Sequence, residues 1–338
     1  MIRRVPDLAP AVSTVVRHCL GVRRGEEVLV IVDAGTRAIG EALREEAAGA
    51  GADAVLAVMD ERVTDGTEPP RPITAALAQC DVFIAPTSRS LSHTNARKRA
   101  DAGARGATLP GVTVEMLTRV MAVDFDLMGR RSKALAALLD EGGVARLTCP
   151  RGSDLTLDLS GRRGISDDGD LTASGAFGNL PCGEGFIAPA GGEGRIVASS
   201  LAPLGLSDEP ATLTVRGGRI VAGRGGLGPA YLARLLAHGE RGTNLAELGV
   251  GSNDRALLTG NMLEDEKILG TAHVAFGASA GIGGTVSVPI HLDVVVLDAS
   301  LEVDGRAVLD AGRYVLDFPA PSPSPPSAQG PPPPKSPQ

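Results

Sequence analysis

Alternating strand-like and helix-like segments in the first 143 residues constrain the fold of this chain more than any other feature. Short apolar runs with the length and composition of buried strands occur at residues 27–32, 54–59, 81–86 and 107–110. Helical patterns lie between them, at residues 36–49, 72–79 and 94–102. Strand, helix and strand joined by short connections indicate a parallel sheet. The sequence therefore predicts an α/β domain of the Rossmann or flavodoxin-like kind over residues 1–143.

A different pattern follows a predicted helix at residues 128–140. From Val144 onward, short β-rich runs are separated by Gly, Asp and Pro, and one clear helix, Gly228 to His238, interrupts them. This pattern predicts an α+β, mostly β, domain over residues 144–318. The last segment, Pro319 to Gln338, contains ten of the chain's 24 prolines and is predicted to be a disordered, proline-rich tail.

Charge and cysteine content exclude several classes of protein. The net charge of −7 argues against a nucleic-acid surface, which needs clustered positive charge. No stretch approaches 18 uninterrupted apolar residues and no signal peptide is recognisable, so we expect no membrane partner. The four cysteines are scattered without CxxC spacing, which fits neither a zinc ribbon nor a disulfide framework. A cytoplasmic location follows as the expectation.

Five residues that can bind a metal lie in otherwise apolar or glycine-rich stretches of the second domain. They are Glu184, Glu247, His273, His291 and Asp293. A carboxylate in an apolar stretch is costly to bury unless a partner or a metal compensates its charge. Three carboxylates and two imidazoles form a mixed oxygen and nitrogen set that suits Zn, Mn, Co or Fe better than calcium.

The spacing of His291 and Asp293 predicts that they share one face of a strand. Residues two apart on a strand point the same way, so both side chains would be aimed at one point. His273 lies on a neighbouring apolar segment, and the glycine-rich connection at residues 281–284 predicts a hairpin that brings it near His291. The alternatives are an exposed polar pair on an edge strand, a core histidine, and salt-bridged surface acids at Glu184 and Glu247.

Two further polar segments receive structural interpretations. The run from Glu264 to Lys267 is typical of a solvated turn or helix start, with at most an indirect role beside the metal ligands. The cluster from Ser92 to Arg97 follows a strand, and we expect Thr94 or Ser92 to cap the next helix, with Arg97 facing a cleft. The first domain offers no cluster of metal ligands, so the chemistry is assigned to the second.

Three segments in order resemble the aminopeptidase T and aminopeptidase S family of metallopeptidases. They read NLPCGEGFIAP, NLAELGVGSNDRALLTGNMLEDEKILGTAHVAFG and GGTVSVPIHLD, and the resemblance extends upstream through SLSHTNARKRADAGARGATLPGVTVEML. It implies a two-domain homodimer with two Zn, Co or Mn ions that removes N-terminal residues from peptides. It also implies that all five candidate residues are ligands, with Glu184 and Glu247 as the candidate catalytic carboxylates.

The chain departs from this family at one catalytic position. The peptidases carry a tyrosine seven residues after the first histidine, and here that residue is Ala280. A related enzyme of the same fold, 2,5-dihydroxypyridine 5,6-dioxygenase, binds one iron. Its HxD pair matches His291 and Asp293, but it has a histidine at the position of Glu247 and apolar residues at those of Glu184 and His273.

The sequence thus predicts a metal-dependent hydrolase of the aminopeptidase or amidase type, acting on a peptide or small amide at a dinuclear site. One alternative is a ring-cleaving dioxygenase with one Fe(II), for which His273, His291 and Asp293 would form a two-histidine, one-carboxylate triad. Another is a non-hydrolytic member of the family that binds a peptide or small molecule in a biosynthetic pathway.

Overall fold

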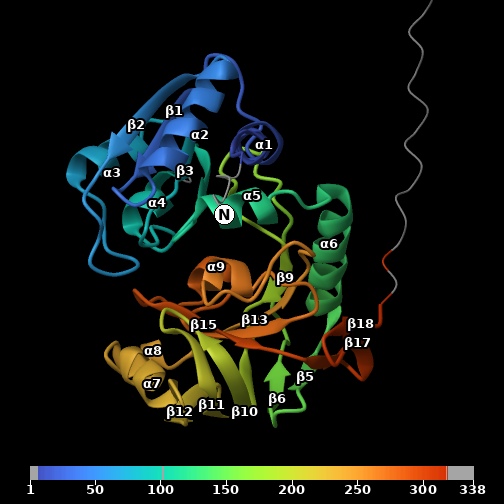
Figure 1. The fold of residues 1–338 in the computed structure, drawn as a ribbon. Helices are drawn as coiled ribbons and strands as arrows, with labels where there is room; N and C mark the ends of the chain where they lie inside the picture. The colour runs from blue at the N-terminus through green and yellow to red at the C-terminus, as the bar shows by residue number, and fades with distance from the viewer. Residues whose placement is uncertain (1–6, 101–102, 317, 319–338) are drawn as a thin grey trace, which may run out of the picture.

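The protein consists of two layers, each built on one sheet. The computed structural model describes residues 7–100, 103–316 and 318. In Figure 1 the smaller layer, in blue and cyan, lies above the larger one, in green, yellow and orange, and α9 lies between them. The predicted tail, Pro319 to Gln338, lies outside the described residues. No helix in the described part of the chain is long and apolar enough to cross a membrane.

The upper layer is the parallel α/β sheet that the sequence predicts. Among the described residues it has five strands in the order β2-β1-β3-β4-β8, and every pairing in it is parallel. Its strands are β1 (Glu27–Val32), β2 (Asp53–Val58), β3 (Val82–Ala85), β4 (Arg105–Thr108) and β8 (Phe177–Asn179). Its helical segments are α1 (Ala9–Ser13), the π-helix η1 (Thr14–Cys19), α2 (Arg37–Gly49), α3 (Arg71–Leu77), α4 (Asn95–Ala100) and α5 (Val114–Val120).

The lower layer is a large antiparallel sheet that curls into a half-barrel. Over the described residues it has thirteen strands, and its longest path runs β18-β17-β16-β5-β6-β10-β15-β14-β13-β9-β7, with β11 and β12 extending from β10. The first of these strands are β5 (Val144–Thr148), β6 (Asp154–Asp158), β7 (Gly164–Asp167), β9 (Glu184–Ile187), β10 (Gly191–Leu201), β11 (Gly205–Arg216) and β12 (Arg219–Arg224). The others are β13 (Leu245–Gly251), β14 (Ala272–Gly277), β15 (His291–Val296), β16 (Ser300–Val303), β17 (Arg306–Asp310) and β18 (Arg313–Tyr314).

Helices close the lower layer on several sides. They are α6 (Phe125–Glu141), α7 (Gly228–Leu236), α8 (Gly239–Gly242), α9 (Met262–Asp265) and the 3-10 turn η2 (Ala280–Ile282). The strands β13, β14 and β15 turn Leu248, Val274 and Val294 into the apolar core, so their opposite faces are free to carry polar side chains.

The chain crosses between the two layers more than once, so no single residue divides them. The strand β8 comes from the sequence after residue 143 but pairs with β4 in the upper sheet. The helix α6 precedes residue 143 but packs against β7 and β9 of the lower layer. Residues on both sides of the predicted boundary can therefore line one site between the layers.

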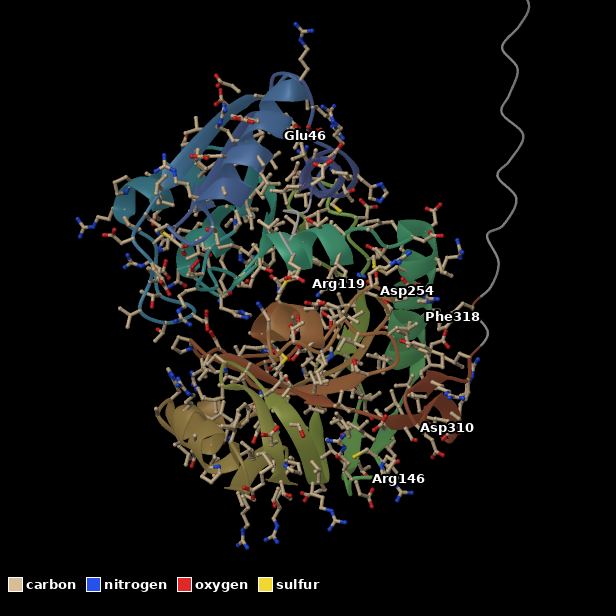
Figure 2. The ribbon with its side chains drawn as sticks, viewed as in Figure 1. Glu46, Arg119, Arg146, Asp254, Asp310 and Phe318 are labelled. Carbon is tan, nitrogen blue, oxygen red and sulfur yellow. The ribbon has the colours of Figure 1, made fainter. Side chains whose placement is uncertain are left out.

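The run from Glu264 to Lys267 is not solvated, which corrects the interpretation from sequence. Its four side chains are buried, with exposed fractions from 0 to 8%. Glu264 forms an ion pair with Arg119 of α5. Figure 2 labels Arg119, which lies at the level where the two layers meet. Asp265 accepts hydrogen bonds from the backbone of Thr259 and Gly260. These charges are compensated by partners from elsewhere in the chain, which a local charge pattern does not reveal.

Candidate metal centre

Four neighbouring strands bring the five predicted residues onto one face of the lower sheet. In the antiparallel register, Glu247 of β13 lies opposite Ala275 of β14, and Ala275 lies opposite Asp293 of β15. His273, two residues before Ala275, points to the same side, and Glu184 reaches that side from β9, opposite Gly251. The predicted hairpin of His273 and His291 and the shared face of the HxD pair are confirmed.

Small residues make room for these side chains. A methyl group on Gly249, which lies opposite His273, would come within 2.1 Å of the imidazole Nε2. Gly277, opposite His291, has a φ of +115°, and a side chain there would approach the carbonyl of Ile290. Glycine is therefore required on both sides of the site.

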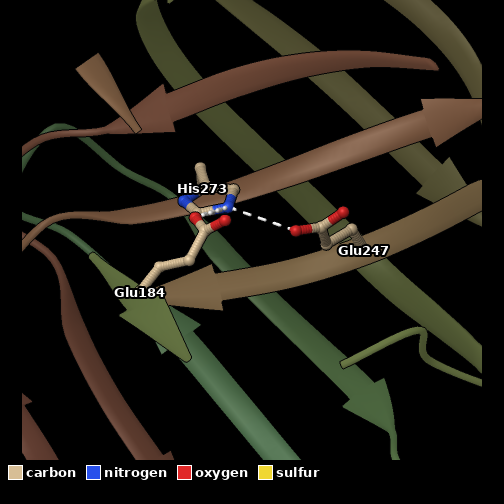
Figure 3. A group of neighbouring side chains, drawn as sticks. All are labelled: Glu184, Glu247 and His273. Atoms are coloured by element: carbon tan, nitrogen blue, oxygen red, sulfur yellow. Dashed lines mark hydrogen bonds and ion pairs between the residues drawn. The ribbon is translucent and has the colours of Figure 1, made fainter. Parts of the chain in front are cut away.

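Glu247 lies between the two imidazoles. Its Oε1 is 3.4 Å from Nε2 of His273, and its Oε2 is 3.2 Å from Nε2 of His291. The Nε2 atom of His273 is also 3.1 Å from Oε2 of Glu184, as Figure 3 shows from one side. Asp293 completes the arrangement, with its Oδ1 3.7 Å from Nε2 of His291.

These contacts define two groups of three possible ligands that share Glu247. In each group the donor atoms lie within 4.8 Å of one another. One group is Glu184, Glu247 and His273, and the other is Glu247, His291 and Asp293. The structure thus contains a candidate buried metal site, and the mixed carboxylate and imidazole donors suit a first-row transition metal.

Backbone partners orient the His291 strand. His291 Nδ1 lies 2.7 Å from the carbonyl oxygen of Ala278, which accepts its proton, so Nε2 is the nitrogen that faces Glu247. The hydroxyl of Tyr231, a fully buried residue on α7, donates to the carbonyl of Leu292, which lies between His291 and Asp293. Both hydrogen bonds hold the HxD pair in place.

The two imidazoles of the site hold their protons, and Glu247 is ionised. Burial opposes the charge on His273 and His291, but Glu184 acts on the first and Asp293 on the second, so both imidazole pKa values rise well above their ordinary range. Burial also opposes ionisation of Glu247, yet hydrogen bonds from both imidazoles lower its pKa. Protons therefore occupy the nitrogens that a metal would take, and the donor set fits a divalent ion that displaces them.

A buried lysine adjoins the first of the two groups. Lys267 Nζ lies 2.5 Å from Oε1 of Glu184, 2.9 Å from Glu266 and 3.3 Å from Asp167. Burial raises the pKa of Asp167 to about 7 and that of Glu266 to about 8. The ammonium thus contacts three acids, of which Glu184 is the nearest.

Two adjoining cavities reach the site from the space between the layers. A cavity of about 690 Å³ is lined by Glu184, Glu247, His291 and Asp293. A smaller one of about 370 Å³ shares His291 and Asp293 with it. Substrates can therefore approach the His291 side of the site, whereas His273 lies beneath it with 1% of its surface exposed.

The upper layer supplies a histidine that the sequence analysis did not assign to the site. His93 lines both cavities, and its ring centroid lies 5.4 Å from that of His291. Burial, aided by the charge on His291, lowers the pKa of His93 to about 3, so its imidazole is neutral at neutral pH. The signal for His93 was its place after a parallel strand, where open sheets bind ligands.

Residues near His93 cap the helix that follows it or line the cavity walls. Thr94 caps α4, since its hydroxyl accepts a hydrogen bond from the backbone of Arg97. Arg97 lines the larger cavity and lies over the ring of Phe177, 3.9 Å from its centroid. Asn179, the last residue of β8, accepts a hydrogen bond of 2.6 Å from Thr108 and lines both cavities.

The position of the missing family tyrosine also lies on the cavity wall. Ala280 is exposed and lines the larger cavity. Neither tyrosine of the chain replaces the phenol, because Tyr231 is bound to Leu292 and the hydroxyl of Tyr314 donates to the carbonyl of Gly251.

Comparisons with known proteins identify one matching family and two proteins of similar fold. The family model described as NicX: 2,5-dihydroxypyridine 5,6-dioxygenase matches residues 7–316. The fold is similar to that of 2,5-dihydroxypyridine dioxygenase from Pseudomonas putida KT2440, with a TM-score of 0.78 and 20% identity, over 92% of this chain and 97% of that one. It is also similar to AmpT from Thermus thermophilus, with a TM-score of 0.68 and 20% identity, over 91% of this chain and 99% of that one. No curated protein matches the sequence significantly.

Proposed function

This chain belongs to the NicX, 2,5-dihydroxypyridine 5,6-dioxygenase, family, and from that premise we propose that it is a metal-dependent oxygenase that opens the ring of a small hydroxylated aromatic or heteroaromatic compound. The family model spans nearly the whole chain, and the fold is shared with a dioxygenase of that name. The hydrolase that the sequence motifs favoured is the second candidate. The choice between them depends on how the site binds its metal.

The observation that carries the proposal is the group of Glu247, His291 and Asp293. Its donors converge within 4.8 Å on the cavity, and none of the described lysines or arginines forms an ion pair with Glu247 or Asp293. The two buried carboxylates have only imidazoles as cationic partners, and a divalent ion can take the place of the imidazole protons. A divalent ion at this point would have open coordination positions toward the cavity.

The chemistry that a bound Fe(II) would supply is the binding of dioxygen and a hydroxylated ring side by side. The chain's own residues would hold and orient the ring. The neutral His93 faces His291 across the cavity and can form a hydrogen bond with a substrate hydroxyl, which would orient the ring. Asn179 is held by Thr108 on the same wall, so it offers a fixed amide to a polar substituent of the ring.

Oxygen consumption tests this proposal. Protein loaded with Fe(II) without air would be mixed with 2,5-dihydroxypyridine, hydroxylated pyridine carboxylates and dihydroxybenzoates in air-saturated buffer. We expect oxygen uptake with at least one ring, together with loss of its ultraviolet absorbance. No uptake with any member of the panel, from protein shown to contain iron, would remove the oxygenase proposal.

A two-metal hydrolase is the second candidate, and the group of Glu184, Glu247 and His273 favours it. This group shares Glu247 with the group of Glu247, His291 and Asp293, so the five residues together could hold two ions. A peptide or small amide would then be the substrate, and the resemblance further implies a homodimer, which light scattering would detect.

The substitution Ala280→Tyr separates the two candidates. Ala280 lines the cavity, so a phenol placed there can reach a bound amide and stabilise developing negative charge. A hydrolase weakened by loss of this phenol should gain activity on aminoacyl-nitroanilides with Zn, Co or Mn. No hydrolysis by wild type or variant with any of the three metals would exclude the peptidase candidate.

A further inference from the structure

Lys267 lies where one half of a dinuclear site would need a cation. Its ammonium contacts the carboxylates of Glu184, Glu266 and Asp167, and only 1% of its side chain is exposed. The other oxygen of Glu184 contacts His273. One carboxylate thus connects the lysine to the imidazole of the buried group.

The backbone fixes this lysine firmly. Lys267 follows α9, and its amide donates to the carbonyl of Glu264, while its own carbonyl accepts a hydrogen bond from the amide of Asn253. The next residue, Ile268, forms a parallel bridge with Asn253. The ammonium is therefore held in place by its main chain as well as by its ion pairs, and its removal would leave three acids at the cavity wall without that cation.

The charges of the two groups differ because of this lysine. Glu184 has a permanent cationic partner, whereas Glu247 and Asp293 have only the two imidazoles. The ammonium lies 2.5 Å from one oxygen of Glu184, so the space beside this carboxylate already contains a cation of the protein. A second divalent ion beside Glu184 would lie close to the ammonium and be repelled by it.

We propose that Lys267 is a built-in cation that takes the place of a second metal, so that the chain binds one divalent ion, at Glu247, His291 and Asp293. In this arrangement Lys267 and Glu184 are positioning residues: the ammonium holds Glu184, and Glu184 holds His273 against Glu247. The inference rests on the metal binding of the proposed function. It names the side chain that would exclude a second ion and explains why a donor set of peptidase type occurs in a member of a dioxygenase family.

Metal stoichiometry with manganese(II) tests the inference without any assay of activity. Metal-free full-length protein would be titrated with manganese(II), desalted and analysed by mass spectrometry, and its spin-resonance spectrum recorded. We expect one manganese per chain with the spectrum of an isolated ion. In Lys267→Met the site loses its internal cation, so we expect two ions per chain and the spectrum of a coupled pair.

Lys133→Met is the matched control. Lys133 pairs with Asp168 on the cavity rim, its side chain is 65% exposed, and it contacts none of the five candidate ligands. The Lys133→Met variant should bind one ion, the number expected for the wild type. Two ions in the wild type, or one ion in a folded Lys267→Met, would overturn the inference.

Glu184→Gln covers the case in which Lys267→Met does not fold. The amide keeps the shape of the side chain and removes its charge, so this variant should keep the single ion. Loss of an ion in Glu184→Gln would show that Glu184 is a ligand and contradict the inference. Absence of manganese from the wild type would be a different failure, because it removes the metal site of the proposed function itself.

Discussion

The two halves of the candidate site share one carboxylate but differ in how their charge is compensated. The closed half is made of Glu184, His273 and Lys267 and contains its own ammonium; Glu184 and Lys267 border the larger cavity only, and His273 lies beneath them. The open half, made of His291 and Asp293, faces both cavities and His93 and has no lysine or arginine partner within the described residues. Glu247 contacts an imidazole of each half.

If Lys267 takes the place of a second ion, as we propose, the number of ligand residues does not give the number of metal ions. The five donors form a complete dinuclear set when read from the sequence. The structure adds a sixth side chain, Lys267, from a segment that the local charge pattern assigned to solvent. A cation supplied by the protein changes what the same ligands can bind.

The largest effect is expected from removing the ligands of the open half. His291→Ala and Asp293→Asn should each lose the bound ion and lower turnover by more than about 100-fold, since losing a ligand exceeds the effect of losing a supporting residue. The fold should persist, because both side chains border a cavity. Metal content and circular dichroism measure the two results. Equal metal loss in Glu184→Gln would remove the distinction between the halves.

The second prediction concerns His93, which faces the open half from the upper layer. His93→Ala should lower kcat/KM by about 100-fold, the loss that a misplaced substrate can cause, while metal content stays at the wild-type value. His238→Ala is the control, because His238 is exposed at the end of α7, and it should leave both quantities unchanged. Loss of metal from His93→Ala would instead make His93 a ligand.

The third prediction disturbs the closed half alone. Gly249→Ala places a methyl group against the ring of His273 and should destabilise the protein by about 1–3 kcal/mol, as overpacking of a tight interior does. The ion at the open half should be retained. Gly281→Ala is the control, since no atom lies within 4 Å of the position of the new methyl group. Thermal melting compares the two, and equal melting temperatures would contradict the packing described around His273.

The smallest effect is expected from Tyr231→Phe, which removes a hydrogen bond to the strand of the open half. Leaving the carbonyl of Leu292 without its donor should cost about 1 kcal/mol of stability and weaken metal binding several-fold. Tyr314→Phe removes a similar bond to the carbonyl of Gly251, which, unlike Leu292, does not lie between two candidate ligands in the chain. This variant should lower stability without changing metal affinity. Calorimetry distinguishes the two. If both variants lost the same amount of metal affinity, the loss would follow from lower stability and not from the hydrogen bond to Leu292.

The sequence predicted the elements whose pattern is local. The parallel strands follow from apolar runs such as residues 27–32, which form β1 with the same bounds. The shared face of His291 and Asp293 follows from the two-residue period of a strand, and the hairpin with His273 follows from the glycines between them. Each of these predictions needed information from only a few neighbouring residues.

The missed features depend on contacts between distant segments. His93 reaches the site because the upper sheet lies over the lower one, and Glu264 is buried because Arg119 of α5 meets it there. The strand β8 joins the upper sheet after a long excursion into the lower layer. No period or composition in one segment encodes such pairings, so the charge run at Glu264 to Lys267 was assigned to solvent.

Anomalous diffraction from crystals grown with manganese(II) tests the central claim most directly, because it locates the ion. The claim is that the open half binds the metal and the closed half does not. We predict one anomalous peak per chain, within bonding distance of Glu247, His291 and Asp293. Absence of that peak, or a second peak between Glu184 and His273, would contradict it.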